Sequence, residues 1–111
     1  MEIDEATHGA VLVLRPQGRL DSSGAPGFEQ RVRERLAEGQ RRLVIDLGAL
    51  DYVSSAGLRI LLVAARSLKA EGGALVLCCA NDTVMNILRV SAFNRIFTIL
   101  PTVAQSVDQL G

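Results

Sequence analysis

Apolar residues along this chain follow two patterns, short continuous runs and helical repeats. Short runs rich in Val, Ile and Leu are typical of buried strands. Repeats in which apolar residues return at every third or fourth position predict amphipathic helices. The runs lie at 11–14, 42–47, 74–80 and 96–99, and a weaker first strand is expected at 3–7. The helical repeats are Phe28, Val32 and Leu36, then Leu58, Leu61, Leu62, Ala65 and Leu68, and then Val84, Ile87 and Leu88.

Small polar residues and one glycine mark the expected helix ends. The expected N-caps are Ser22 or Ser23, Asn81 and Thr102, and the expected C-terminal stop of the first helix is Gly39. Ser, Thr and Asn suit N-caps because their side-chain oxygens accept from free backbone N–H groups. Thr102 and Gln105 have the spacing of a capping box, which predicts one more helix at the C-terminus.

The order of these elements predicts the fold class. From about residue 11 it is β-α-β-α-β-α-β-α, which implies an α/β layer with mainly parallel strands and right-handed crossovers. We expect four to five strands in a mixed, mostly parallel sheet, packed by about four helices, with the first strand antiparallel at one edge. Loops that follow parallel strands meet at one end of a sheet. Asp21 in the polar loop 18–24, Ser55 and the turn at Asn81 are therefore expected at the same end.

The join between the central strand and the longest helix is Ser54-Ser55-Ala56-Gly57. Either serine can cap the helix, and a glycine in the first turn tolerates tight packing, so a purely structural role for this segment is the plain alternative to a functional one. Ala56 and Gly57 are small, which leaves bare backbone that a partner can approach closely. A second apolar stripe runs along this helix beside its core stripe, and surplus apolar surface is typical of a docking face. That stripe is Ala56, Ile60, Val63, Ala64 and Ser67.

Composition excludes several classes of protein. The chain has 111 residues, the size of one domain, and 12 basic residues balance 12 acidic ones. No net field therefore attracts nucleic acid or anionic lipid. No apolar run is long enough to cross a bilayer, and the N-terminus is acidic where a signal peptide is basic. We expect a cytoplasmic protein without membrane insertion.

No residue set points to catalysis, a metal or a cofactor. The only histidine, His8, lies beside a turn glycine far from the serine pair, so no base is expected near a serine nucleophile. No Cys/His/Asp cluster has metal-ligand spacing. Cys78 and Cys79 are adjacent in an expected strand, so their side chains should point to opposite faces as reduced, small apolar groups. We expect a protein that is not an enzyme.

The segment 51–59, Asp-Tyr-Val-Ser-Ser-Ala-Gly-Leu-Arg, resembles the signature of the STAS-domain anti-sigma factor antagonists. The segments 18–21, 72–73 and 93–97 also fit that family. The resemblance implies a single STAS-like domain over residues 1–111. It also places the family's phosphorylated serine on Ser55. Many members have aspartate immediately before that serine, where this chain has Ser54.

The resemblance implies a partner switch. In this family the unphosphorylated protein binds an anti-sigma factor, which is a serine kinase, and thereby releases the sigma factor. Phosphorylation, here on Ser55, abolishes binding, and a serine phosphatase reverses it. The expected partner-binding residues are Asp21, Ser54, Ser55, Ala56, Gly57, Arg59, Ile60 and Val63.

Two other uses of a STAS domain stay open at this point. Similar domains serve as cytoplasmic accessory subunits of lipid ABC transporters, where the same helix grips an ATPase subunit without a kinase. Others are sensing or scaffold modules, for which a small ligand near Asp21 is the expectation. The surplus apolar stripe is equally suited to a homodimer.

Overall fold

The computed structural model describes all 111 residues of the chain. The strands are β1 (Ile3–His8), β2 (Val11–Pro16), β3 (Gly18–Leu20), β4 (Arg42–Asp46), β5 (Leu50–Val53), β6 (Ala74–Cys78) and β7 (Ile99–Leu100). The helices are α1 (Ala25–Ala37), α2 (Ser55–Ala70), α3 (Asp82–Val90) and α4 (Val103–Leu110), with a 3-10 turn at Phe93–Arg95.

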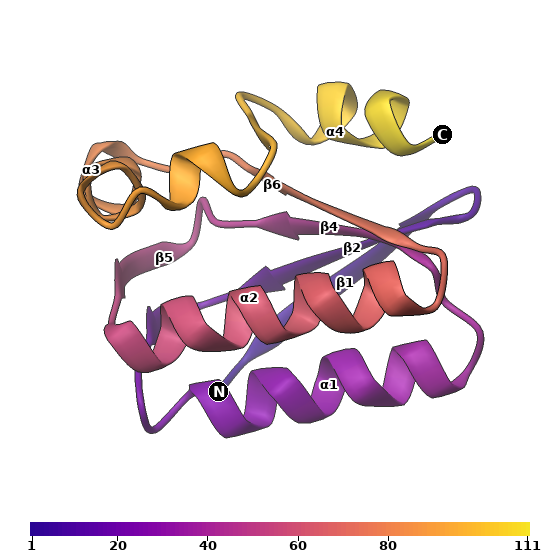
Figure 1. Ribbon diagram of the computed structural model, residues 1–111, viewed down its shortest axis with the longest axis horizontal. Coiled ribbons are helices and arrows are strands. Elements are labelled where there is room, and N and C mark those ends of the chain that lie inside the picture. Colours follow the sequence, from indigo (N-terminus) through magenta and orange to yellow (C-terminus); the bar gives the residue numbers. More distant parts are fainter.

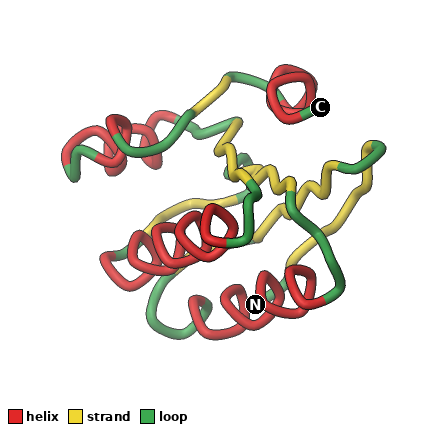
Figure 2. The backbone as a smooth tube through the Cα atoms, turned by 45° about the vertical axis from the view of Figure 1, so that its right-hand side comes forward, coloured by secondary structure: helices red, strands yellow, loops and turns green.

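Five strands form the main sheet in the order β1-β2-β4-β6-β7. The β1 edge strand is antiparallel to β2, and the other pairs are parallel. Helices α1 and α2 cover one face of this sheet and α4 covers the other, as Figures 1 and 2 show. The predicted α/β class, mixed sheet and antiparallel first strand are confirmed.

Side chains of β2 show why this sheet needs helices on both faces. Leu12 and Leu14 belong to the larger core cluster under α1 and α2. Val11 and Val13, which alternate with them along the strand, belong to the smaller cluster under α4. Successive strand residues point to opposite faces, so an apolar run without alternation must be covered twice.

A second sheet of two strands, β3 and β5, is the main feature that sequence patterns missed. Residues 18–20 were expected in a loop, but they pair in parallel with 50–53. A three-residue strand is too short to show a period, and its partner lies some thirty residues away, so only the folded chain brings the two together.

Two expected strands have different bounds in the structure. The run 96–99 contributes only Ile99 to β7, because a turn at Ala92, with φ of +63°, leads into the 3-10 segment. Phe97 is buried while Ile96 is 59% exposed. The run 74–80 stops at Cys78 because Cys79 has φ of +62°, outside strand geometry.

The beginning of α1 also differs from its prediction. Its N-cap is Gly24, with no side-chain cap from Ser22 or Ser23. Instead the Asp21 carboxylate accepts from the N–H of Ser23 at 3.0 Å and of Gly24 at 3.1 Å. A carboxylate therefore shapes the loop that sequence analysis assigned to a serine hydroxyl. The other predicted N-caps, at Asn81 and Thr102, are confirmed.

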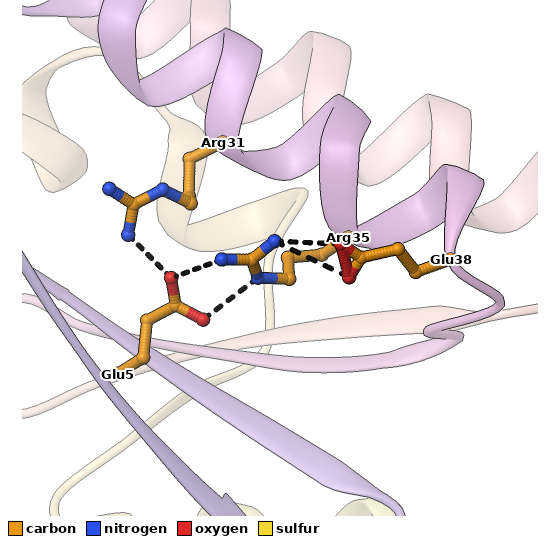
Figure 3. A network of polar contacts seen from close by, with 4 residues as sticks. All are labelled: Glu5, Arg31, Arg35 and Glu38. Carbon is orange, nitrogen blue, oxygen red and sulfur yellow. Dashed lines mark hydrogen bonds and ion pairs between the residues drawn. The ribbon is translucent and has the colours of Figure 1, made fainter.

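An ion-pair network ties the β1 edge to α1 (Figure 3). Glu5 of β1 pairs with Arg31 and with Arg35, whose Nε lies 2.9 Å from Glu5 Oε1. Arg35 also pairs with Glu38 at 3.0 Å. Hydrogen bonding to Arg35, joined by Arg31, lowers the pKa of the Glu5 carboxyl below its ordinary value of 4.5, against a smaller opposing effect of burial.

Replacing Glu5 by Gln should lower the free energy of unfolding by about 0.5–1 kcal/mol at neutral pH, because it removes one charge of a partly exposed network. A lowered carboxyl pKa contributes stability above the unfolded-state pKa, and this contribution is lost as pH falls through the folded-state pKa. The difference between wild type and Glu5→Gln in urea denaturation should therefore shrink below pH 4.5. Glu2→Gln, at an exposed carboxylate without an ion pair, is the control and should show no such trend.

Candidate functional site

Ser54 is the N-cap of α2, and its hydroxyl both accepts and donates a hydrogen bond within the protein. Its Oγ accepts from the N–H of Gly57 at 3.3 Å and donates to the carbonyl of Leu20 at 3.4 Å. Its N–H donates to the same carbonyl at 2.9 Å. Of the two serines that can cap the helix, the structure therefore selects Ser54 for this role.

Ser55 is left free by this arrangement. It is the first residue of α2, it is exposed, and its hydroxyl makes no hydrogen bond within the protein. The N–H groups of Ser55 and Ala56 have no acceptor, as is usual in a first helical turn. An unbonded hydroxyl thus lies at the positive end of the helix dipole, open to solvent.

Gly57 has the structural one of its two expected roles, tight packing inside the fold. It is buried, and a Cβ atom there would lie 2.1 Å from the Leu20 carbonyl oxygen and 2.9 Å from Cγ1 of Val53. The close approach that this glycine permits is therefore internal, between the first turn of α2 and the end of β3. It positions the serines beside it and offers no surface to a partner.

Two grooves flank the exposed ridge of α2, which contains Ser55, Arg59, Arg66 and Lys69. The α1–α2 groove, of about 330 Å³, brings together four predicted partner-binding residues, Ala56, Arg59, Ile60 and Val63. The α2–α3 groove, of about 310 Å³, contains Ser55 itself. A larger hollow of about 640 Å³ lies among the loops 38–42 and 72–74, away from every predicted site residue.

The α2–α3 groove contains apolar residues that sequence reasoning missed. Tyr52 is 38% exposed and Val90 is 80% exposed, and both line this groove together with Leu58 and Ile87. Val90 lies off the core-facing stripe of α3. An apolar residue on the outer face of a short helix was the sequence signal that could have predicted this exposed surface. Ser55 is therefore bordered by exposed apolar surface on the α3 side.

The second apolar stripe of α2 is partly core. Ala64 is only 4% exposed and belongs to the main cluster. Val63 and Ser67 line a small hollow with Val32 and Leu36 of α1. Much of this stripe is therefore apolar because α1 packs against it, and only its N-terminal part, at the α1–α2 groove, remains open.

Asp21 lies next to the serines, as expected for loops that follow neighbouring parallel strands. Besides shaping the loop before α1, its carboxylate lies 3.7 Å from Nε of Arg19. The Arg19 guanidinium is 4.8 Å from the centre of the Tyr52 ring, so the pairing of β3 with β5 joins these groups. On the other side, Asn81 Nδ2 donates to the carbonyl of Leu50 at 2.7 Å. The expectation that these three loops gather at one end is confirmed.

The expectation that Cys78 and Cys79 point to opposite faces is wrong. The positive φ of Cys79 turns its side chain back, and its Sγ lies 3.3 Å from Sγ of Cys78. Both thiols are free, and with Asp46 they form a group whose ligand atoms lie within 4.8 Å of one another. The Asp46 carboxylate is already bonded to the N–H of Gly48 at 2.8 Å and paired with Arg15 at 3.5 Å. Burial raises the pKa of Cys78 to about 12, and that of Cys79 is also raised, so both are thiols at neutral pH.

Comparison with known proteins identifies the family. The profile of the STAS domain matches residues 2–106, so the chain belongs to this family. BtrV of Bordetella bronchiseptica, provisionally assigned as an anti-sigma factor antagonist, is 39% identical over 89 residues, covering 80% of this chain and 77% of that protein. The anti-sigma F factor antagonist of Paenibacillus polymyxa is 26% identical over 99% of this chain and 92% of its own length.

Solved structures of the same description share the fold. An anti-sigma factor antagonist from Mycobacterium paratuberculosis superposes with a TM-score of 0.88 at 24% identity, covering 98% of this chain and 92% of its own. The unphosphorylated antagonist SpoIIAA gives a TM-score of 0.83 at 18% identity, covering 97% of this chain and 95% of its own. No helix of the present structure has the length and apolar character needed to cross a membrane.

Replacing Gly57 by Ala should destabilise the fold by about 2 kcal/mol or more, because the added methyl group meets backbone that cannot move aside. Gly27→Ala is a matched control, since it is also the third residue of a helix and its added Cβ would meet only ordinary contact at 3.7 Å. Urea denaturation should show a lower midpoint for Gly57→Ala alone. Equal midpoints would contradict the packing role of this glycine.

The raised pKa of Cys78 predicts slow alkylation in the folded protein, because the thiolate is the reactive form. At pH 8, iodoacetamide should modify Cys78 at least about 100-fold more slowly in the native protein than in the urea-unfolded chain. Peptide mass spectrometry over time measures both rates. Rapid labelling of the native protein at Cys78 would contradict the buried-thiol description.

Proposed function

We propose that this protein is an anti-sigma factor antagonist, controlled by phosphorylation of Ser55. In this proposal the unphosphorylated form binds an anti-sigma factor and thereby releases a sigma factor. Family membership and the names of the relatives support this function over the other uses of STAS domains. The observation that supports Ser55 as the site is the difference between the two serines. Ser54 caps α2, whereas Ser55 is exposed and its hydroxyl makes no hydrogen bond.

The partner surface that we propose lies around the N-terminus of α2. The exposed Ser55 and Arg59 form its centre, and the open parts of the two grooves lie on either side. Tyr52 and Val90 add apolar area that a partner can cover. Asp21 holds the loop before α1 through its hydrogen bonds, and Ser54 holds the start of α2. Gly57 allows the first turn of α2 to approach the end of β3 closely.

Phosphate on Ser55 changes this surface without melting the fold. It adds a charge of about −1.5 to −2 at neutral pH. The dipole and the free N–H groups of the first turn favour that charge by roughly 0.3–1 kcal/mol at an exposed position. A partner that sits flush on a neutral hydroxyl, by contrast, meets a hydrated dianion and is repelled. The anti-sigma factor acts as the ATP-dependent serine kinase in this proposal, and a serine phosphatase restores the binding form.

Substitutions of Ser55 test the switch directly. Ser55→Ala should fold with unchanged stability, bind the anti-sigma factor and resist modification. Ser55→Asp should fold equally well and bind at least about tenfold more weakly, since it places a charge in the interface. Calorimetric titration with the purified partner gives both affinities.

Ser54→Ala is the matched control for position. It should lose about 1 kcal/mol of stability with the cap and still be phosphorylated on Ser55. Mass spectrometry after incubation with the kinase and ATP identifies the modified residue. Phosphate on Ser22, Ser23 or Ser54 would refute the assignment of Ser55, and co-purification with a transporter ATPase would replace the proposed function.

A further inference from the structure

Helix α2 differs from the other helices in its charge. It carries Arg59, Arg66 and Lys69 but no carboxylate, whereas α1, α3 and α4 each contain acidic residues. All three cations are exposed and none forms a salt bridge. The ridge that carries Ser55 is therefore uniformly basic, with cations that no internal anion occupies.

Arg59 is the cation nearest to Ser55 along this ridge. It follows Ser55 by four residues, so the two side chains lie one helical turn apart on the same exposed face. One carboxylate, that of Glu29, lines the same groove as Arg59 and could compete for it. Glu29 is already bonded to Arg33 of its own helix at 3.1 Å, so Arg59 remains available.

We propose that Arg59 is the internal counter-ion of phosphoserine 55 and thereby part of the switch, an inference that rests on the proposed function. In the unmodified protein Arg59 is free to pair with an acidic group on the partner. After phosphorylation its guanidinium fork turns to the phosphate oxygens, a geometry that allows two parallel hydrogen bonds. An anion four residues before a cation is also the favoured order on a helix.

The switch then acts twice on one interface. The phosphate introduces a dianion where the partner sits, and it withdraws the cation that the partner would otherwise contact. Arg66 lies eleven residues from Ser55, about 16 Å along the helix axis, beyond the reach of the same phosphate. Arg59 and Arg66 thus provide a matched pair, with equal charge, exposure and freedom from ion pairs but different distances.

The test uses full-length protein with phosphoserine incorporated at position 55 during translation, so no kinase is needed. The readout is the second ionisation of the phosphate, near pH 6 when unperturbed, followed by ³¹P NMR. Arg59→Gln should raise this pKa by roughly 0.3 unit or more, the size that an exposed helical ion pair supports. Arg59→Lys should give a phosphate pKa between those of the wild type and Arg59→Gln. Arg66→Gln should leave the phosphate pKa at the wild-type value.

Equal phosphate pKa values in the wild type and Arg59→Gln would overturn the inference, as would equal shifts in Arg59→Gln and Arg66→Gln, which indicate a general charge effect. Circular dichroism confirms that each variant is folded. The outcome is separate from that of the proposed function, because failure of a kinase to modify Ser55 leaves the NMR comparison intact. Binding completes the test: unphosphorylated Arg59→Gln should bind the anti-sigma factor about fivefold or more weakly than Arg66→Gln.

Discussion

The site depends on one close contact, between the first turn of α2 and the carbonyl of Leu20. Ser54 bonds to this carbonyl through its N–H and its hydroxyl, and Gly57 packs against it with no side chain. The contact docks the start of the longest helix onto the end of β3. The cap and the glycine form a platform from which the neighbouring Ser55 is exposed to solvent.

This platform is compatible with the proposed switch, because the hydrogen bonds that hold it do not involve the Ser55 hydroxyl. Ser54, which is half-buried, makes hydrogen bonds within the fold, and Gly57 is buried against the Leu20 carbonyl. The hydroxyl of Ser55, the proposed site of modification, makes no hydrogen bond within the protein, so a phosphate there replaces no bond of the fold. At the positive end of a helix the phosphate charge is favoured by the dipole, so it does not destabilise the fold. The same charge still weakens binding to a partner surface.

Most of the fold was predictable from local sequence signals. Apolar runs and helical repeats gave the order of strands and helices, and Asn81 and Thr102 gave two correct N-caps. The failures have two physical causes. The β3 strand depends on a contact with a distant segment and the turn at Cys79 on a single backbone angle, and neither leaves a period in the sequence. The bonds from Asp21 are local, two and three residues along the chain, but Asp21, Ser22 and Ser23 all have side-chain oxygens that can accept there, and the sequence does not choose among them.

The sequence alone determined the chemistry available at the site: two adjacent serines, small neighbours after them, and a basic, apolar helix to carry them. Only the tertiary structure decided which serine caps α2, because the Leu20 carbonyl, from another part of the chain, accepts hydrogen bonds from Ser54. It also showed that Gly57 serves internal packing and that α3 adds Val90 to the surface. The sequence states which side chains are present at the site. Their exposure and their hydrogen bonds depend on segments that only folding brings next to them.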